Sequence, residues 1–479
     1  MEELRAALHV TSIAGFGIAV AMLVPAFVNL AADESSWIDF AWASTITGFC
    51  WALIATATRG VHVQITPRFG IILVNMLWWV VPMTSVAPLM VGPTQLGYID
   101  AAFETVSGFT TTGSTVLIGL DGYDPGTLIW RSLIQWFGGT GMLSLGLIVL
   151  PFLKVGGLQL FRLESSDRSE KVLPRFATIV RSIIVVYVLL TVLCGLGYVL
   201  SGMSVFDAVN HAMTTLSTGG FSTHDQSMGF FENNSTLWVG SVFMILGGLP
   251  FTLFVTVLYL RQKPRRDPQI RWFLAIIAGA VFMLLVSRAG SGVGSSRSVA
   301  EDFFDVISVI TTTGFAAGDY TTWGNLALPL FFILTFFGGC AGSTAGGLKI
   351  YRLIVLTQMV RVALREIVHP HGVFRVRYGR KQVDPAIFRS ALVMSVSFAG
   401  IVAVCTLILG SQGNDLITSL SGAVTALANV GPGLGSVIGP AGTFTNVPDA
   451  SKITLAAAMI AGRLEIMVVL ALLLPAMWR

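Results

Sequence analysis

"FTTTGST", residues 109–115, is a charge-free run of threonines closed by a glycine, and it lies between apolar segments long enough to cross a bilayer. Similar runs follow at three later places: "LSTGGF" at 216–221, "ITTTGF" at 310–315 and "ANVGPG" at 428–433. We call these runs the first, second, third and fourth loops. The loops recur about every 100 residues, which indicates an internal fourfold repeat. Their glycines are Gly113, Gly219, Gly314 and Gly431.

The composition identifies a membrane protein. The chain has 479 residues, of which 54% are hydrophobic and only 11% are charged, whereas soluble domains carry roughly 25% charged residues. Long stretches lack Asp, Glu, Lys and Arg altogether, and a spanning helix needs about 20 apolar residues. We therefore expect a polytopic membrane protein. The charge-free stretches are 6–32, 40–58, 69–99, 132–153, 182–206, 233–260, 320–348 and 390–414.

Each loop follows a segment that is too short to cross the membrane. The segments are "DAAFETVSGFTT", "DAVNHAMTTLST", "DFFDVISVITT" and "TSLSGAVTALAN". As a helix, residues 100–113 would span about 20 Å, less than a bilayer core of about 30 Å. Long apolar segments flank each one. We predict an all-α membrane protein with ten transmembrane helices and four re-entrant pore helices, arranged as four pseudo-symmetric helix–pore loop–helix repeats around one pore.

The predicted repeats follow a short N-terminal extension. We divide the chain into a two-helix extension (1–60), repeat 1 (69–153), repeat 2 (176–262), repeat 3 (268–368) with an intramembrane gate loop (338–347), a basic cytoplasmic linker (369–389) and repeat 4 (390–479).

Basic residues set the expected orientation. They gather around residues 59–68, 154–181, 261–271 and 349–389, while the intervening loops are acidic. By the positive-inside rule, the basic loops and the N-terminus face the cytoplasm. This pattern is a topology signal, and we expect no nucleic-acid partner.

Glycine and threonine suit these turns to ion binding. Irregular backbone inside a membrane is tolerated only where it is buried in protein or lines a wet cavity. Four converging turns could present rings of carbonyls that replace the water of an ion. The C-terminal ends of the short helices carry partial negative charge, which favours a cation. The alternative for a single copy is an ordinary helix C-cap followed by a loop.

The motifs resemble those of the Trk/Ktr/HKT superfamily of cation transporters, most closely the TrkH branch of bacterial potassium uptake proteins. "TVSGFTTTG", "STGGFSTHD", "ITTTGF" and "NVGPGLG" look like the four filter loops of that family, in order, and "FFGGCAGSTAGGLKI" at 336–350 is similar to its intramembrane gate. The resemblance implies potassium as the bound ion and no organic cofactor in this chain. Sodium permeation stays open, because the fourth loop lacks threonine. The filter residues carried over are Thr111, Thr112, Gly113, Ser217, Thr218, Gly219, Thr312, Thr313, Gly314, Asn429, Val430 and Gly431.

A glycine-rich segment is the predicted gate. Residues 338–347 hold five glycines, and such a run does not form a stiff helix. We expect the intramembrane Arg463 to point into the pore, contact carbonyls of this segment and raise an electrostatic barrier to cations. Lys349 either contributes to that barrier or extends to the cytoplasm. The gate residues are Gly338, Gly339, Gly342, Ser343, Thr344, Gly346, Gly347, Lys349 and Arg463.

Small-residue pairs mark the second spanning helix of every predicted repeat. Outside the third repeat they are open to two interpretations: close helix packing or a part in the ion path. The pairs are Gly138-Gly139, Gly247-Gly248, Gly338-Gly339 and Ala461-Gly462.

The basic amphipathic stretch after the gate also has two interpretations. Residues 348–382 could contact anionic lipid or dock a cytosolic regulator. The resemblance implies a TrkA-like cytosolic ring of nucleotide-binding subunits that responds to ATP/ADP and NAD(H), a homodimer of this chain, and a place in the bacterial cytoplasmic (inner) membrane.

The function hypothesis is potassium uptake through a gated filter, driven by the membrane potential. A proton- or sodium-coupled symporter, or a less selective K⁺/Na⁺ conductor, is the alternative on the same scaffold. Coupling to protons needs an ionisable relay in the membrane, for which Glu104 and Glu465 are the main candidates. We do not expect an enzyme, since no cluster of His, Asp or Glu gathers at one membrane depth.

Overall fold

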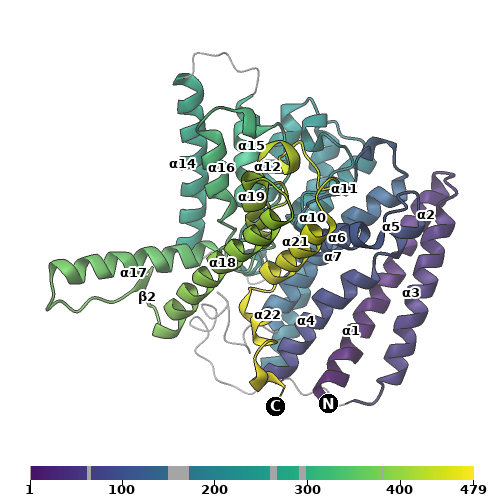
Figure 1. The fold of residues 1–479 in the computed structure, drawn as a ribbon, viewed down its shortest axis with the longest axis horizontal. Helices are drawn as coiled ribbons and strands as arrows, with labels where there is room; N and C mark the ends of the chain where they lie inside the picture. The colour runs from purple at the N-terminus through teal and green to yellow at the C-terminus, as the bar shows by residue number, and fades with distance from the viewer. Residues whose placement is uncertain are drawn as a thin grey trace.

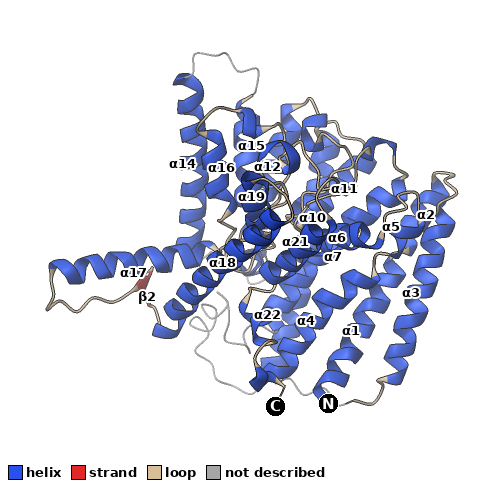
Figure 2. Ribbon diagram, in the orientation of Figure 1, coloured by secondary structure: helices blue, strands red, loops and turns tan. Residues whose placement is uncertain are grey.

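A computed structural model gives the fold as a bundle of helices (Figures 1 and 2). It describes residues 2–61, 66–148, 172–258, 261, 267–290, 298–379 and 381–478. The strands in this part of the chain form one small antiparallel hairpin, β1 (Arg377–Tyr378) with β2 (Lys381–Gln382). The basic residues between 154 and 171, and most of the third basic loop at 262–266, lie outside the described residues.

The elements follow the predicted repeats. The N-terminal extension holds α1 (Glu2–Ala21), α2 (Leu23–Ala31) and α3 (Trp37–Ala57). Then come α4 (Pro67–Thr84), α5 (Ala87–Val91), α6 (Tyr98–Phe109), η1 (Leu120–Gly122) and α7 (Pro125–Ile148). These are followed by α10 (Val172–Leu200), α11 (Val205–Leu216), η2 (Ser227–Phe230), α12 (Asn234–Gly248) and α13 (Phe251–Leu258). Next are α14 (Pro268–Gly290), α15 (Val299–Ile310), η3 (Tyr320–Thr322), α16 (Ala327–Thr335) and α17 (Ile350–Val368). The chain ends with α18 (Pro385–Ser411), α19 (Leu416–Ala428), α20 (Gly435–Ile438), α21 (Asp449–Arg463), α22 (Met467–Ala471) and η4 (Pro475–Met477).

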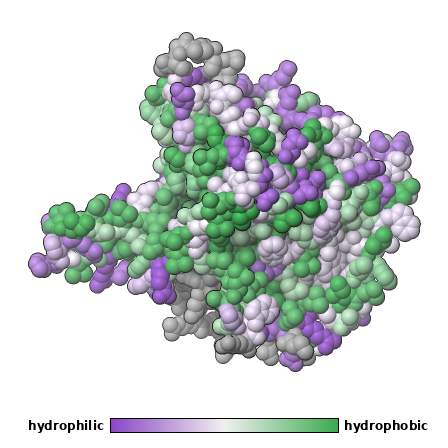
Figure 3. Space-filling model, in the orientation of Figure 1, coloured by the Kyte–Doolittle hydropathy of each residue, from purple (hydrophilic) through white to green (hydrophobic). Residues whose placement is uncertain are grey.

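The outer helices present apolar side chains to their surroundings. In the described part of the chain, six helical segments are long and apolar enough to cross a membrane, or seven if the bent pair α12–α13 counts as one span. Large side chains such as Phe27, Phe49 and Phe282 are exposed on them. Figure 3 shows extensive apolar surface between more polar regions. The prediction of an all-helical, multi-pass membrane protein is confirmed.

Four short helices lie inside this bundle. α6, α11 and α15 have 12 residues each and α19 has 13, so each is about 20 Å long. Side chains cap the N-termini of three: Ser204 for α11, Ser298 for α15 and Asp415 for α19. The C-terminal half of every one of these helices is buried. Their position agrees with segments that enter a membrane without crossing it.

The second long helix of a repeat is broken more often than the sequence indicated. α7 runs straight through Gly138, whereas α12 and α13 meet at an angle of 91°. Pro250 lies at that bend, and proline has no N–H to continue a helix. α21 ends at Arg463, and the backbone turns through positive φ at Glu465 and Ile466 before α22. The sequence predicted an interruption only in the third repeat.

Candidate functional site

The four loops share one backbone conformation. Each short helix ends in a residue with left-handed φ, and a glycine with positive φ follows two positions later, a conformation that costs glycine little. The left-handed residues are Thr111, Thr218, Thr312 and Asn429, with φ of 52°, 54°, 57° and 56°. The glycines are Gly113, Gly220, Gly314 and Gly431, with φ of 87°, 76°, 81° and 111°.

The residue between these two positions closes the end of the helix. Its N–H donates to the carbonyl five residues earlier, at 2.8 to 3.0 Å in all four loops. We call these four the ring residues; they are Thr112, Gly219, Thr313 and Val430. The loops are therefore helix C-caps as well as converging turns, so the ordinary C-cap interpretation is true of the local geometry and incomplete.

This geometry corrects the predicted alignment of the second loop. The sequence matched Ser217, Thr218 and Gly219 to the other filter residues, but the structural equivalents are Thr218, Gly219 and Gly220. Ser217 instead lies in the right-handed region at the end of α11. Two adjacent glycines made the shift invisible in the sequence, because either can adopt positive φ.

The loops contact one another in a closed cycle. A methyl group at Gly113 would lie 2.2 Å from the Gly219 oxygen of the second loop. The same test on the next three glycines gives equally close approaches to the next loop, and the last returns to the first. These are Gly220 to the Thr313 oxygen (2.0 Å), Gly314 to the Val430 oxygen (1.9 Å) and Gly431 to the Thr112 oxygen (2.6 Å). The four ring oxygens therefore lie in one closed ring, and each approach leaves room only for glycine.

Side-chain hydroxyls hold the loops against their own helices. The hydroxyls of Thr110 and Thr112 are 2.7 Å apart, and those of Thr311 and Thr313 repeat this contact at 2.7 Å. Asn429 donates from Nδ2 to Thr112 Oγ1 at 3.0 Å. These contacts occupy the threonine side chains and leave the ring backbone carbonyls as the groups that the loops share.

Glycines on the flanking helices allow them to pack on the short helices. A methyl group at Gly138 would lie 2.0 Å from the carbonyl oxygen of Phe109, and one at Gly462 would lie 1.9 Å from that of Leu427. Both oxygens belong to the last turn before a loop. Close packing is therefore the role that the structure gives these two glycines.

The glycine-rich segment lies against the loops. As its glycine content predicts, residues 336–349 are not helical, and Gly338 N–H bonds the Leu348 carbonyl in a hairpin-like return. The Thr344 hydroxyl donates to the Leu216 carbonyl at the end of α11 at 3.0 Å. Gly346 N–H donates to Thr312 Oγ1 at 2.6 Å. The segment thus touches the second and third loops directly.

Arg463 lies beside this segment. Its guanidinium is buried, and Nη1 donates to the Thr344 carbonyl at 2.9 Å. Nε and Nη2 are buried and have no hydrogen-bond partner among the described residues. A buried arginine with two unsatisfied nitrogens is a concentrated positive charge.

Two further basic side chains are buried near Arg463. The Lys349 ammonium donates to the Ala345 carbonyl of the gate segment and is 5% exposed, so it does not extend to cytoplasmic water. Arg352 forms a buried ion pair with Glu465 at 2.5 Å. Glu465 therefore pairs with a residue of α17.

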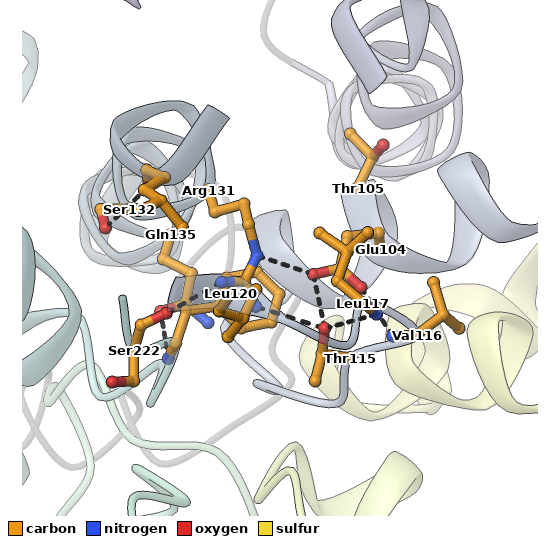
Figure 4. Close-up of polar contacts among 12 residues, drawn as sticks. Glu104, Thr105, Thr115, Val116, Leu117, Leu120, Arg131, Ser132, Gln135 and Ser222 are labelled. Atoms are coloured by element: carbon orange, nitrogen blue, oxygen red, sulfur yellow. Dashed lines mark hydrogen bonds and ion pairs between the residues drawn. The ribbon is translucent and has the colours of Figure 1, made fainter. Parts of the chain in front are cut away.

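A second buried ion pair, which the sequence did not predict, supports the loops from outside (Figure 4). Arg131 Nε on α7 lies 2.9 Å from Glu104 Oε1 on α6, and both side chains are almost wholly buried. Arg131 also donates to the Ser222 carbonyl at 2.9 Å, while Glu104 accepts from Val116 N–H at 2.9 Å. Only the isolated charges within apolar segments could have hinted at this pairing.

A histidine clasp joins the loops on the acidic side. His224 Nδ1 bonds Asp121, its Nε2 lies 3.4 Å from Asp207 Oδ1, and its ring stacks on Phe230. Burial lowers the pKa of His224, but hydrogen bonds to Asp207 and Asp121 outweigh burial and raise it above 6.5. The bond to His224 lowers the pKa of Asp121.

Side-chain metal ligands do not account for the site. Among the described residues, no group of three or more His, Cys, Asp or Glu could hold a metal ion. The chemistry that the ring offers is backbone oxygen, which suits a weakly hydrated monovalent cation.

Comparisons with known proteins agree with this geometry. A family model described as "TrkH: Cation transport protein" matches residues 40–477. The Trk system potassium uptake protein TrkI of Halomonas elongata is 41% identical over 474 residues, covering 98% of this chain and 96% of the relative. TrkH of Vibrio parahaemolyticus is 33% identical over 469 residues, covering 96% of each.

A solved structure has the same fold. The crystal structure of the potassium transporter TrkH from Vibrio parahaemolyticus superposes with a TM-score of 0.89 at 30% identity, over 99% of both chains. The family consists of transport proteins rather than enzymes. With the family model matched over most of its length, the chain belongs to the TrkH family of cation transport proteins.

Proposed function

We propose that this chain carries potassium into the cell through a filter formed by the four loops. The observation that supports the proposal most is the closed ring of the Thr112, Gly219, Thr313 and Val430 oxygens. Stacked carbonyls replace the hydration shell of K⁺, and the C-terminal ends of four short helices add partial negative charge. Relatives named potassium uptake proteins support the choice of ion.

The proposed filter keeps the predicted residues with one change. It comprises the left-handed residue, the ring residue and the glycine of each loop, so Gly220 joins and Ser217 leaves. The residues are Thr111, Thr112, Gly113, Thr218, Gly219, Gly220, Thr312, Thr313, Gly314, Asn429, Val430 and Gly431. Potassium is the substrate, and we propose no organic cofactor for this chain.

The proposed gate is the segment 338–347 together with Arg463. The hydrogen bond from Arg463 to the Thr344 carbonyl supports this role, because it holds a buried positive charge against a loop that touches the filter. A cation that leaves the filter toward this side would meet the charge of Arg463 and of Lys349. Opening would require the segment to move, and its glycines allow a change of backbone conformation.

The proposed topology has ten spans and four pore helices. The spans would be α1–α2, α3, α4, α7, α10, α12–α13, α14, α16–α17, α18 and α21–α22, with α6, α11, α15 and α19 as pore helices. The two termini lie at the same end of the bundle, as an even number of spans requires (Figure 1). We place both termini in the cytoplasm of a bacterial cell, with the chain in its inner membrane.

The proposed partners act at the cytoplasmic side. α17 runs out sideways from the bundle (Figure 1), and its last turns expose Val360, Leu364 and Ile367. We propose that this region meets the bilayer surface, a second copy of the chain and a TrkA-like nucleotide-binding ring that senses ATP/ADP and NAD(H). The words "Trk system" in the relatives' names support a multi-component assembly.

The membrane potential is sufficient to drive this uptake. One charge moving through 100 mV gains roughly 2.3 kcal/mol, and about 1.4 kcal/mol corresponds to a tenfold gradient. The two carboxylates considered for proton coupling, Glu104 and Glu465, each pair with a buried arginine. This pairing favours conduction over proton-coupled transport.

Ion flux into proteoliposomes tests the proposal. The purified full chain is reconstituted, and uptake of K⁺, Rb⁺ and Na⁺ is followed with and without a pH gradient. We expect K⁺ and Rb⁺ uptake driven by a negative internal potential alone. A strict requirement for the proton gradient would favour the symporter, and the absence of any monovalent cation flux would reject both transport functions.

A further inference from the structure

Gln135 on α7 holds the second loop through its side-chain amide (Figure 4). The residue is fully buried. Nε2 donates to the Gly219 carbonyl at 2.6 Å, and Oε1 accepts from Phe221 N–H at 3.1 Å. The amide therefore bridges the loop on both sides of Gly220. One helical turn away, Arg131 donates to the Ser222 carbonyl, so one face of α7 follows the loop.

Gln135 also explains why a glycine stands at position 219. The other loops carry side chains at the equivalent ring position, namely Thr112, Thr313 and Val430. Gly219 does not adopt positive φ, so its backbone would accept a side chain. A methyl group there would lie 2.3 Å from Gln135 Oε1 and 2.4 Å from Cδ. The amide of Gln135 fills the space that a side chain would take.

The second loop differs from the others in this respect. The residues three positions before the small-residue pair in the other repeats are Met244, Thr335 and Ala458, and none has an amide. Within the hydrogen bonds of the described residues, the Gly219 oxygen is the ring oxygen that accepts from a side chain. One quarter of the ring is thus tethered from outside.

We propose that Gln135 is a positioning residue that makes the ring discriminate between potassium and sodium. The proposal rests on the proposed function of the ring. Coordination of the smaller Na⁺ requires the oxygens to move inward, whereas K⁺ fits them at a wider spacing. The bond from Gln135 holds the Gly219 oxygen at its present distance, and the bond to Phe221 N–H keeps the backbone beyond it in register. Gln135 acts on the ion through the second loop.

Ion-dependent thermal stability of the full chain tests this role. A ligand that binds only the folded state raises the melting temperature with its concentration, so titrations with K⁺ and with Na⁺ give the ratio of half-effective concentrations without any need for flux. The variants are Gln135→Leu, which keeps the volume and loses both bonds, and Gln135→Glu, which cannot donate to the Gly219 oxygen. Ser132→Ala is the matched control, since Ser132 is a buried neighbour that bonds only its own helix at Leu128.

We expect both Gln135 variants to lower the preference for K⁺ over Na⁺ by about fivefold, the size of one buried hydrogen bond, while Ser132→Ala retains the wild-type ratio. Gly219→Ala should give the same loss, because the new methyl group displaces the amide. The double variant Gln135→Leu/Gly219→Ala should lose no more than either single one. Wild-type discrimination in a monodisperse Gln135→Leu or Gln135→Glu protein would overturn the inference, as would losses that multiply in the double variant.

Gly113→Ser separates this inference from the function beneath it. If Gly113→Ser alters the ion ratio and the Gln135 variants do not, the inference fails and the filter remains. If none of these variants alters the ratio and no ion stabilises the wild-type protein, the filter itself is rejected along with the inference.

Discussion

Arg463 donates a hydrogen bond from Nη1 to the carbonyl oxygen of Thr344 at 2.9 Å, which joins the end of α21 to the glycine-rich segment of the third repeat. The same segment reaches the third loop through Gly346. A charge on the last spanning segment and the ion path are therefore connected by a few residues. This connection is the physical basis for a gate that responds to movement of α16, α17 or α21.

Replacement of Arg463 by alanine should raise flux through the closed protein. About 1.4 kcal/mol less barrier corresponds to a tenfold rate, and a buried charge near the path accounts for at least that much. Rb⁺ uptake into proteoliposomes measures the effect. Arg463→Lys keeps the charge and should stay near the wild-type rate, whereas reduced uptake by a well-folded Arg463→Ala protein would argue against a barrier.

Gly346→Ala should also increase basal flux. A methyl group there would lie 2.4 Å from the Ala428 carbonyl oxygen, so the gate segment could not pack against the end of α19. Ion discrimination should be retained, because the ring residues are untouched. Gly279→Ala is the control, since nothing lies within 4 Å of a methyl group at that position. Equal flux in wild type and Gly346→Ala would exclude the segment as the closed gate.

Gly113→Ser should weaken the discrimination between K⁺ and Na⁺ by about tenfold, or roughly 1.4 kcal/mol. Gly113 has φ of 87° and contacts the ring oxygen of Gly219, so a side chain must displace that oxygen or the loop. Competition of Na⁺ with Rb⁺ uptake measures the change. Gly97→Ser, at an open position with φ of −60°, is the matched control. Unaltered competition in Gly113→Ser would remove the first loop from the filter.

The sequence predicted the architecture better than the details of the site. Repetition of a short helix and a loop was visible because each loop needs the same turn residues. The alignment of the second loop was wrong by one residue, since Gly219 and Gly220 look alike in sequence and only the backbone distinguishes them. The contacts of Gln135 and Arg131 were missed because they join segments about 90 residues apart. Tertiary contacts of this kind have no local pattern.

Loss of the buried pair between Arg352 and Glu465 should destabilise the protein. Removal of one partner leaves an uncompensated buried charge, which costs about 3 kcal/mol or more. Glu465→Gln should therefore lower the melting temperature markedly, and Glu465→Gln combined with Arg352→Met should recover part of the loss. The exposed Glu366→Gln is the control. A Glu465→Gln protein as stable as wild type would show that the pair does not contribute.

The clasp of His224 should be stabilising at low pH and lost at high pH. The pKa of His224 is raised in the folded protein, so its contribution is complete below about pH 6.5 and disappears as the pH rises through the raised value. The pKa of Asp121 is lowered, so its part is lost only in strong acid. The melting temperature of wild type minus that of His224→Gln, followed from about pH 6 to pH 9, should decrease. A difference that is constant or grows with pH would contradict this sign.

The position of a bound ion tests the central claim most directly. Crystals of the full chain grown in Rb⁺, an anomalous scatterer that replaces K⁺, would locate the ion independently of any flux assay. We predict an anomalous peak inside the ring, in contact with the carbonyl oxygens of Thr112, Gly219, Thr313 and Val430. A peak that contacts only one or two of the loops, or no peak at the ring while Rb⁺ binds elsewhere, would contradict the account.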